Sequence, residues 1–326
     1  MQAWLCENPV GVEALRWAKL DTPEPAAGQV RIAIHAASLN FPDLLTVQGK
    51  YQIKPPLPFV PGSEFSGRVD KVGEGVQHLA VGDLVATVGV SGGFATHACV
   101  DVASVLALPA GFDLDDAAGF VLTYGTTHHA LIDRAALQAG ETVLVLGAAG
   151  GVGSAAIQIA KAAGARVIAA ASSAEKCAFC KQLGADETID LGQASLRDAL
   201  KAATAGRGPD VVYDPVGGEL AEAAFRSIAW RGRYLVIGFA AGPIPALPWN
   251  LALLKGASIV GVFWGDFVRR EPKAFQQSLA ELFRWHAQGK VKPVIDSRLP
   301  MAALAQAYDR MGSRQVRGKL LLVNGP

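Results

Sequence analysis

The stretch with the clearest chemical meaning is TVLVLGAAGGVG at residues 142–153, which predicts a buried strand, a glycine-rich turn and a helix. The run at 142–146 is apolar without alternation, as in a strand covered on both faces. Such a turn aims the first N–H groups of the helix, and the positive end of its dipole, at a pyrophosphate. We therefore expect a dinucleotide to bind the turn at Ala149, Gly150, Gly151 and Val152.

The match to the dinucleotide motif G-x-G-x-x-G is imperfect, because Ala148 stands at the first glycine when Gly150 and Gly153 are aligned. Glycine turns also serve as packing devices. A membrane span is a second interpretation, since residues 142–160 carry no charge and approach the roughly 20 residues that a bilayer needs. The glycines in the middle of this segment, and the repeated pattern downstream, favour the nucleotide site.

The type of nucleotide is indicated by the end of the next predicted strand. In NAD-binding units an acidic residue about 20 positions after the turn binds the ribose. Here no carboxylate occurs before Glu175, whereas Ser172, Ser173 and Lys176 offer hydroxyl groups and a cation that suit a 2′-phosphate. This pattern favours NADPH over NADH, although the serines could simply cap the helix that follows.

Length and charge limit the number of domains and the kinds of partner that this chain can have. A chain of 326 residues predicts about two domains, and 30 Lys plus Arg against 29 Asp plus Glu leave no basic face for nucleic acid. The N-terminus, MQAWLCENPVGVEALRW, lacks the basic start and apolar core of a signal peptide. We expect a cytoplasmic protein without nucleic acid or membrane as a partner.

The chain changes character near Tyr124. Residues 1 to about 120 predict short strands separated by tight turns, consistent with a small barrel or curled sheet. From there to residue 263, strands and helices alternate, and six strands in two halves predict a doubly wound parallel sheet. The final strand, Lys319 to Val323, is expected to return to the first domain and to leave a ligand cleft between the domains.

Two pairs of residues that could bind a metal are interpreted as structural. Cys177 and Cys180 lie in a predicted helix with no second cysteine or histidine pair at zinc-finger spacing. His128 and His129 are adjacent, so on a helix they point about 100° apart and do not easily share a metal.

Six segments carry a resemblance to a known family: AASLNFPDLL at 36–45, PGSEFSGRVDKVG at 61–73, VGDLV at 81–85, LGAAGGVG at 146–153, KQLGAD at 181–186 and RGKLLL at 317–322. Together they resemble the medium-chain dehydrogenase/reductase superfamily, and within it the zinc-free quinone oxidoreductases related to zeta-crystallin. The resemblance implies a GroES-like β-rich domain, residues 1–121 and 266–326, split around a Rossmann domain, residues 122–265.

The resemblance also implies that no zinc is bound. Zinc members hold the catalytic metal with a cysteine in the first of these segments and a histidine in the second, where this chain has Asn40 and Ser63 and keeps only Glu64. An amide and a hydroxyl are poor zinc ligands. The acceptor should therefore take hydride without metal activation.

The function implied by the resemblance is NADPH-dependent reduction of a quinone. Asn40 would donate to a developing oxyanion, and Tyr51 would stack on the substrate ring or supply a proton. Two alternatives remain open: reduction of the C=C bond of an enone or enoyl thioester, and a structural or redox-sensing NADPH-binding protein with little turnover.

The resemblance also implies further contacts to the cofactor and a dimer. Further cofactor-binding residues are expected at Tyr124, Thr127, Gly238, Phe239, Phe263, Trp264, Gly265 and Arg317. Asp190 and Leu191 stand where many NADPH-using relatives have a tyrosine or arginine. The apolar segment SIVGVFW at 258–264 is expected at an unprotected sheet edge, so a homodimer is expected.

Overall fold

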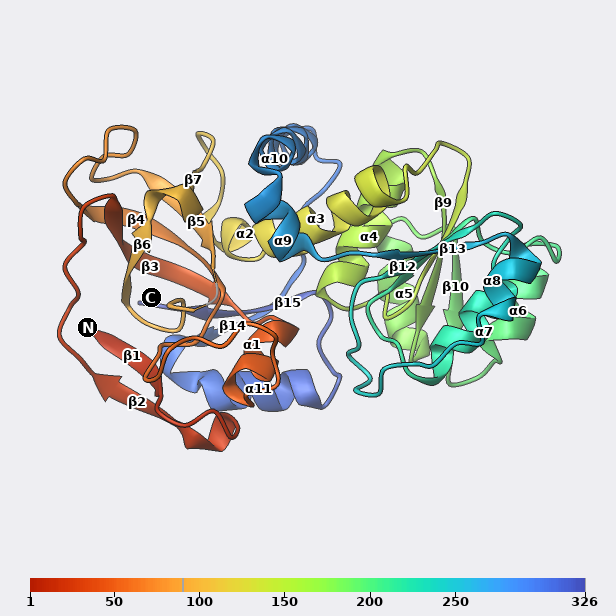
Figure 1. Cartoon of the computed structure of the whole chain (residues 1–326), viewed down its shortest axis with the longest axis horizontal. Helices are drawn as coiled ribbons and strands as arrows, with labels where there is room; N and C mark the ends of the chain where they lie inside the picture. Colours follow the sequence, from red (N-terminus) through yellow and green to blue (C-terminus); the bar gives the residue numbers. More distant parts are fainter. Residues whose placement is uncertain (90, 326) are drawn as a thin grey trace. The chain divides into compact units, whose positions relative to one another are not determined.

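The computed structural model describes residues 1–89 and 91–325 and divides the chain into two compact units, Met1–Leu122 with Val294–Pro326, and Thr123–Pro293 (Figure 1). The second unit ends at Pro293, whereas the predicted Rossmann domain ends at residue 265. Helix α10 (Pro272–Ala287) belongs to the second unit because Phe275 packs edge-on against Trp264 and Phe267, and Ser278 bonds to His128.

The first unit is built on a seven-stranded sheet with the order β14-β15-β3-β4-β5-β7, in which β6 also pairs with β3. A separate antiparallel pair is formed by β1 and β2. The strands are β1 (Gln2–Cys6), β2 (Leu15–Lys19), β3 (Gln29–Ser38), β4 (Glu64–Val72), β5 (Leu84–Val88), β6 (His97–Asp101), β7 (Val105–Ala107), β14 (Ile295–Pro300) and β15 (Lys319–Val323). The helices are α1 (Phe41–Val47), α2 (Leu114–Ala118) and α11 (Leu304–Gly312).

Alternation in β3 explains the core of this unit. Val30, Ile32 and Ile34 are buried and alternate with more exposed residues, and they join one hydrophobic cluster with residues of β4 and α11. The predicted return of the last strand is confirmed, since β15 pairs antiparallel with β3 through Leu321 and Ser38.

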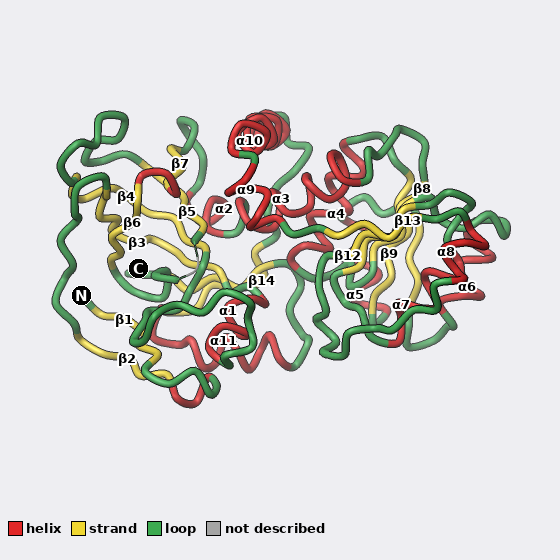
Figure 2. Tube along the Cα trace, in the orientation of Figure 1, coloured by secondary structure: helices red, strands yellow, loops and turns green. Residues whose placement is uncertain are grey.

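The second unit holds a six-stranded parallel sheet with the order β10-β9-β8-β11-β12-β13, which confirms the doubly wound fold (Figure 2). Its strands are β8 (Thr142–Val145), β9 (Arg166–Ala171), β10 (Glu187–Asp190), β11 (Val211–Asp214), β12 (Arg233–Val236) and β13 (Ser258–Gly261). The helices are α3 (Val121–His128, which begins in the first unit), α4 (Gly151–Ala162), α5 (Ala174–Gln182), α6 (Leu196–Ala203), α7 (Glu219–Ser227), α8 (Asn250–Lys255), α9 (Trp264–Arg270) and α10.

Strand β8 lies at the centre of this unit, and each of its residues is buried. Residues of α6 and α7, among them Leu200 and Phe225, form one hydrophobic cluster with Leu144. Helices α4 and α5 pack against β8, β9 and β10. None of the helices in the described part of the chain combines the length and the apolar character needed to cross a bilayer.

Candidate active site

The glycine turn that follows β8 leaves the start of α4 without a side-chain cap. The N-cap residue, Gly150, has no side chain to satisfy the first N–H groups of this 12-residue helix. Gly150, Gly151 and Val152 are only partly buried, whereas Ala149 is buried. Uncapped N–H groups and the helix dipole together favour an anion at this position.

The glycines of this turn are under different conformational and steric constraints. Gly147 has φ +57°, and a Cβ on Gly153 would lie 2.3 Å from the carbonyl oxygen of Gly147. These two residues are needed to fold the turn. A Cβ on Gly150 would meet only that same oxygen, at 3.4 Å, so folding does not require glycine at 150. A ligand that comes close to the backbone would explain it.

The end of β9 gathers hydroxyl groups and a cation, as predicted. Ser173 caps α5 by accepting from the backbone N–H of Lys176 at 3.4 Å, so its predicted alternative role as a cap is present. Ser172 is exposed, and its Oγ accepts from Lys176 Nζ at 3.4 Å. Asp190 lies opposite Ala171 on β10, but its Oδ1 accepts from the N–H of Gly192 at 2.9 Å. Asp190 therefore caps its own turn.

The ends of β11 and β12 lie side by side. Asp214 Oδ1 accepts from the N–H groups of Val216 and Gly217 at 2.7 and 2.8 Å, which fixes the turn after β11. A Cβ on Gly217 would lie 2.9 Å from the ring of Phe239. Gly238 and Phe239 are partly buried at this edge of the sheet, where an open parallel sheet binds its ligands.

In the first unit, Asn40 lies in a buried polar cluster. Its Nδ2 lies 3.1 Å from Glu64 Oε2 and 3.2 Å from Ser38 Oγ, and its Oδ1 accepts from Lys319 Nζ at 2.6 Å. Asn40 is only 5% exposed. Its amide N–H groups point at protein acceptors, and the predicted donation to a substrate oxyanion stays a prediction.

Asp43 and Tyr51 lie beside this cluster. Asp43 accepts from the backbone N–H groups of Asn40 and Ser63 at 2.8 and 2.9 Å, and burial raises its pKa to about 6. Tyr51 is partly buried; burial, with a smaller contribution from the charge of Asp43, raises the pKa of its hydroxyl. The phenol of Tyr51 is therefore protonated at neutral pH and can donate.

Comparison with known proteins agrees with these two units. Residues 26–110 match the family model described as the alcohol dehydrogenase GroES-like domain, and residues 151–284 match the one described as zinc-binding dehydrogenase. Quinone oxidoreductase-like protein 2 of Mus musculus is 39% identical over 302 residues, 92% of this chain and 86% of that protein. Its homologue in Nematostella vectensis is 36% identical over 324 residues, 98% of this chain and 88% of that protein.

A solved structure extends the comparison. The quinone oxidoreductase of Escherichia coli, solved in complex with NADPH, is similar with a TM-score of 0.91 at 27% identity, covering 99% of this chain and 100% of that one. The chain belongs to the quinone oxidoreductase-like proteins of the medium-chain dehydrogenase/reductase superfamily. The predicted resemblance and fold are thereby confirmed.

Three residues that the family resemblance placed at the cofactor are buried by their own unit. Tyr124 is 1% exposed, and its hydroxyl donates to the carbonyl of Lys292 at 2.7 Å. Thr127 is fully buried and bonds to the hydroxyl of Tyr213 at 2.9 Å. Trp264 packs against Gly125, where a Cβ would lie 2.8 Å from its ring. These side chains pack against residues of the second unit, and their predicted cofactor contact stays a prediction.

The other predicted contacts remain accessible. Phe263 is half exposed, and Gly265 and Arg317 are exposed. The backbone N–H of Arg317 donates to Asp296 Oδ1 at 3.1 Å within the first unit. A cofactor role for these three residues stays a prediction.

The donors at positions 40, 63 and 64 do not fit a zinc ion, although one matching family model carries zinc in its name. The Oδ1 atom of Asn40 already accepts from the ammonium group of Lys319, and Ser63 offers only a hydroxyl. Within residues 1–89 and 91–325, no group of three His, Cys, Asp or Glu side chains is arranged to hold a metal.

The histidines and the paired cysteines occupy structural positions. His128 contacts Ser278 and Glu281 of α10, whereas the ring of His129 stacks on Phe267 with centroids 3.9 Å apart. Cys177 and Cys180 lie buried in α5, and burial raises the pKa of both thiols.

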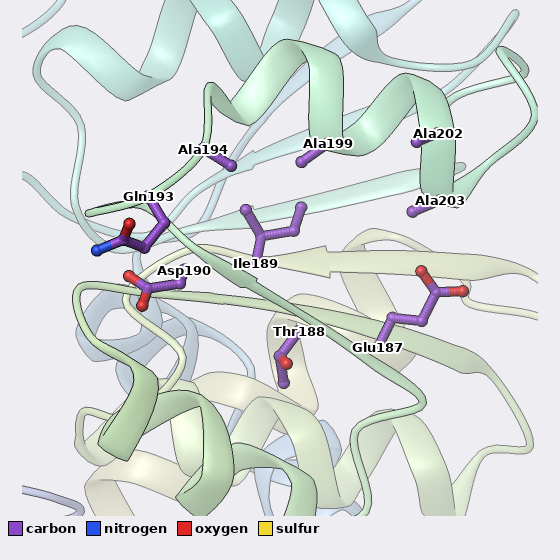
Figure 3. Close-up of a pocket in the computed structure, with 9 residues that line it drawn as sticks. All are labelled: Glu187, Thr188, Ile189, Asp190, Gln193, Ala194, Ala199, Ala202 and Ala203. Carbon is purple, nitrogen blue, oxygen red and sulfur yellow. The ribbon is translucent and has the colours of Figure 1, made fainter.

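A solvent-open hollow of about 450 Å³ lies elsewhere, between the edge strand β10 and helix α6 (Figure 3). Asp190 and Gln193 stand at one end and Glu187 at the other, with alanines of α6 between them (Figure 3). None of the predicted cofactor-binding residues lines it.

Two residues of the buried polar cluster around Asn40, namely Lys319 and Asp43, were not predicted from the sequence. Lys319 is a lone cation within the otherwise apolar run KLLLV, which signals a buried partner. Asp43 stands three residues after Asn40, and the spacing is that of a helix capping box, which the structure contains.

Proposed function

We propose that this protein is an NADPH-dependent oxidoreductase that reduces quinones by hydride transfer without zinc. The observation that carries the proposal is the uncapped start of α4 behind a glycine turn, in a member of this family. Ser172 directly follows the adjacent strand β9, and Lys176 of α5 reaches it. The NADPH complex of the E. coli quinone oxidoreductase supports the choice of cofactor.

The residues of the second unit fit this cofactor. The N–H groups at Gly151 and Val152 would hold the pyrophosphate, because Gly150 leaves room for it. The hydroxyl of Ser172 and the ammonium of Lys176 would bind the 2′-phosphate. When bound, NADPH supplies a hydride from its nicotinamide ring.

The acceptor needs one proton as well as the hydride, because a quinone becomes a hydroquinone by gaining two electrons and two protons. We assign the proton to the hydroxyl of Tyr51, a partly buried side chain near Asp43 that is protonated at neutral pH; the tyrosinate that remains regains its proton from water. Asn40 holds the neighbouring backbone and donates to Glu64 and Ser38, so it serves the reaction by positioning.

The proposal is tested by following NADPH oxidation with 1,4-benzoquinone, 9,10-phenanthrenequinone and small enones. We expect turnover of the quinones above roughly 1 s⁻¹ and binding of NADPH at least about tenfold tighter than NADH. Turnover confined to enones would favour C=C reduction. Tight NADPH binding with no turnover of any acceptor would favour a binding protein.

The role of Tyr51 has its own test. Tyr51→Phe removes only the hydroxyl and should lower kcat for quinone roughly 100-fold, with the dissociation constant of NADPH unchanged. Unchanged kcat would remove Tyr51 from the mechanism.

We further propose that a second copy of this chain covers the outer edge of β13. Large apolar side chains are exposed on this strand and in the segments that precede and follow it along the chain: Ile244, Trp249, Leu253, Leu254, Ile259 and Phe263. Strand β13 ends the sheet of the described chain, so its outer edge offers backbone groups to an identical strand related by a twofold axis.

A further inference from the structure

The buried ammonium of Lys319 is a feature of the first unit that the proposed reaction does not use directly. Lys319 is 4% exposed and begins β15. Its Nζ donates to Asn40 Oδ1 at 2.6 Å, to the carbonyl of Leu39 at 3.2 Å and to Glu64 Oε2 at 3.5 Å. A buried ammonium is tolerated only with such partners, and its three hydrogens have three acceptors here.

Glu64 is the charge that this ammonium balances. The carboxylate is fully buried at the start of β4. Its Oε2 accepts from Ser38 Oγ at 2.6 Å and from Asn40, and its Oε1 accepts from the backbone N–H of Leu122 at 2.7 Å. Because Leu122 lies in the first turn of α3, one carboxylate joins the end of β3, the start of β4 and the start of that helix.

The pair also fixes which way the amide of Asn40 faces. Its oxygen meets an ammonium donor and its nitrogen meets a carboxylate acceptor, so a flipped amide would oppose like groups at both ends. Asn40 is the N-cap of α1, and the chain that leaves α1 leads to Tyr51. The orientation of this amide therefore affects the segment that carries the proposed proton donor.

The backbone at Gly119 packs closely against the side chain of Lys319. A Cβ on Gly119 would lie 3.4–3.6 Å from the carbons of the lysine, so the backbone passes close over its stem. Asp43 is the second carboxylate that faces the ammonium, and it opposes, as Glu64 does, the lowering of the pKa of Lys319 by burial. The side chain is thus held along its whole length.

We propose that Lys319 is a positioning residue, whose ammonium holds Asn40 and Glu64 in a single arrangement and thereby fixes the start of α1 and the segment leading to Tyr51. The consequence for turnover rests on the proposed function. The coupling between Lys319 and Glu64 does not, and it can be measured in the folding equilibrium alone.

The folding test compares Lys319→Met, Glu64→Gln and the double variant by urea unfolding. Methionine keeps most of the apolar stem and removes the charge, so Lys319→Met should lower the folding equilibrium constant roughly 100-fold, because Glu64 is left buried and unpaired. In the double variant the folding equilibrium constant should fall by a factor at least about fivefold smaller than the product of the two single-variant factors. Strictly additive losses would overturn the proposal.

A matched control is the exposed ion pair of Lys71 and Glu24 in the same unit. Lys71→Met removes the same ammonium group at the surface and should change the folding equilibrium constant by no more than about fivefold. A loss as large as that of Lys319→Met would show that burial and pairing are not the cause, and would contradict the proposal.

The turnover test separates positioning from general damage. In folded Lys319→Met, kcat for quinone should fall roughly 10- to 100-fold, while NADPH binding is unchanged because the groups assigned to its phosphates, at Gly151, Val152, Ser172 and Lys176, lie in the second unit. Unchanged kcat would refute the positioning role. If the unaltered protein turns over no acceptor, the proposed function fails, whereas the folding test still decides the coupling.

Discussion

Gly150 and Gly153 lie in the same turn, but the space available for a side chain differs between them. A Cβ at 153 would lie 2.3 Å from the backbone oxygen of Gly147, whereas a Cβ at 150 would meet that oxygen at 3.4 Å. Only the first of these approaches is forbidden between protein atoms. Folding therefore requires glycine at 153, whereas at 150 we attribute the glycine to the binding of the cofactor.

The corresponding prediction pairs two substitutions. Gly153→Ala should destabilise the protein by about 2 kcal/mol or more, because the turn must move to admit the methyl group. Gly150→Ala should keep stability within about 1 kcal/mol, yet raise the dissociation constant of NADPH at least about tenfold by crowding the pyrophosphate. Urea unfolding and fluorescence titration measure the two effects. Equal behaviour of the two variants would contradict this division.

Lys176 should distinguish the two nicotinamide cofactors. Its ammonium lies 3.4 Å from Ser172 Oγ at the end of β9. Lys176→Ala should weaken NADPH binding about tenfold and leave NADH binding unchanged, because only NADPH carries the 2′-phosphate. Lys181→Ala is the control, since Lys181 lies in the same helix and bonds to the backbone oxygen of Asp186. Equal weakening of both cofactors by Lys176→Ala would remove it from the phosphate site.

At the scale of elements, α10 is joined to α3 through one buried histidine. His128 Nδ1 lies 2.8 Å from Ser278 Oγ and its Nε2 lies 3.0 Å from Glu281 Oε2. Burial lowers the pKa of His128, and the attraction of Glu281, with a smaller contribution from Asp133, offsets only part of that effect. The folded protein therefore binds a proton at this site less readily than the unfolded chain does.

The sign of the pH effect follows from this shift. Above the unfolded pKa of about 6.5 the histidine is neutral in both states, and its contribution to stability is complete. As pH falls below that value the unfolded chain gains a proton first, so stability decreases. His128→Gln should cost about 1 kcal/mol at pH 7.5 and should lose less stability than the parent between pH 7 and pH 5. Parallel pH profiles in urea unfolding would contradict this account.

At the scale of the molecule, each unit has its own hydrophobic core, and β15 completes the sheet of the first unit from the far end of the chain. The sheet of the second unit ends in an apolar edge strand, β13, where Ile259 is 43% exposed. An exposed edge of this kind invites a partner strand.

Oligomeric state tests this interpretation. Ile259→Lys places a charge on the edge strand and should shift a dimer to monomer in sedimentation velocity, with at least about tenfold weaker association. Val81→Lys is the control, because Val81 is also apolar and, at 66%, more exposed than Ile259, but lies in the first unit. A parent protein that is monomeric at high concentration would contradict the proposed dimer.

The sequence by itself determined the order of elements and the nucleotide-binding turn. The apolar run at 142–146 predicts a buried strand, and the glycines, serines and Lys176 that follow are local signals within single turns of the chain. The doubly wound parallel sheet followed from the repeated alternation of strands and helices, and the structure gives its strand order.

Only the tertiary structure decided which side chains face inward. Tyr124, Thr127 and Trp264 stand at the expected positions in the sequence, yet packing within the second unit buries them. Lys319 meets Asn40 and Glu64 across sequence separations of 279 and 255 residues. No local pattern encodes such a contact, since it exists only once β15 has paired with β3 and brought distant charges out of water together.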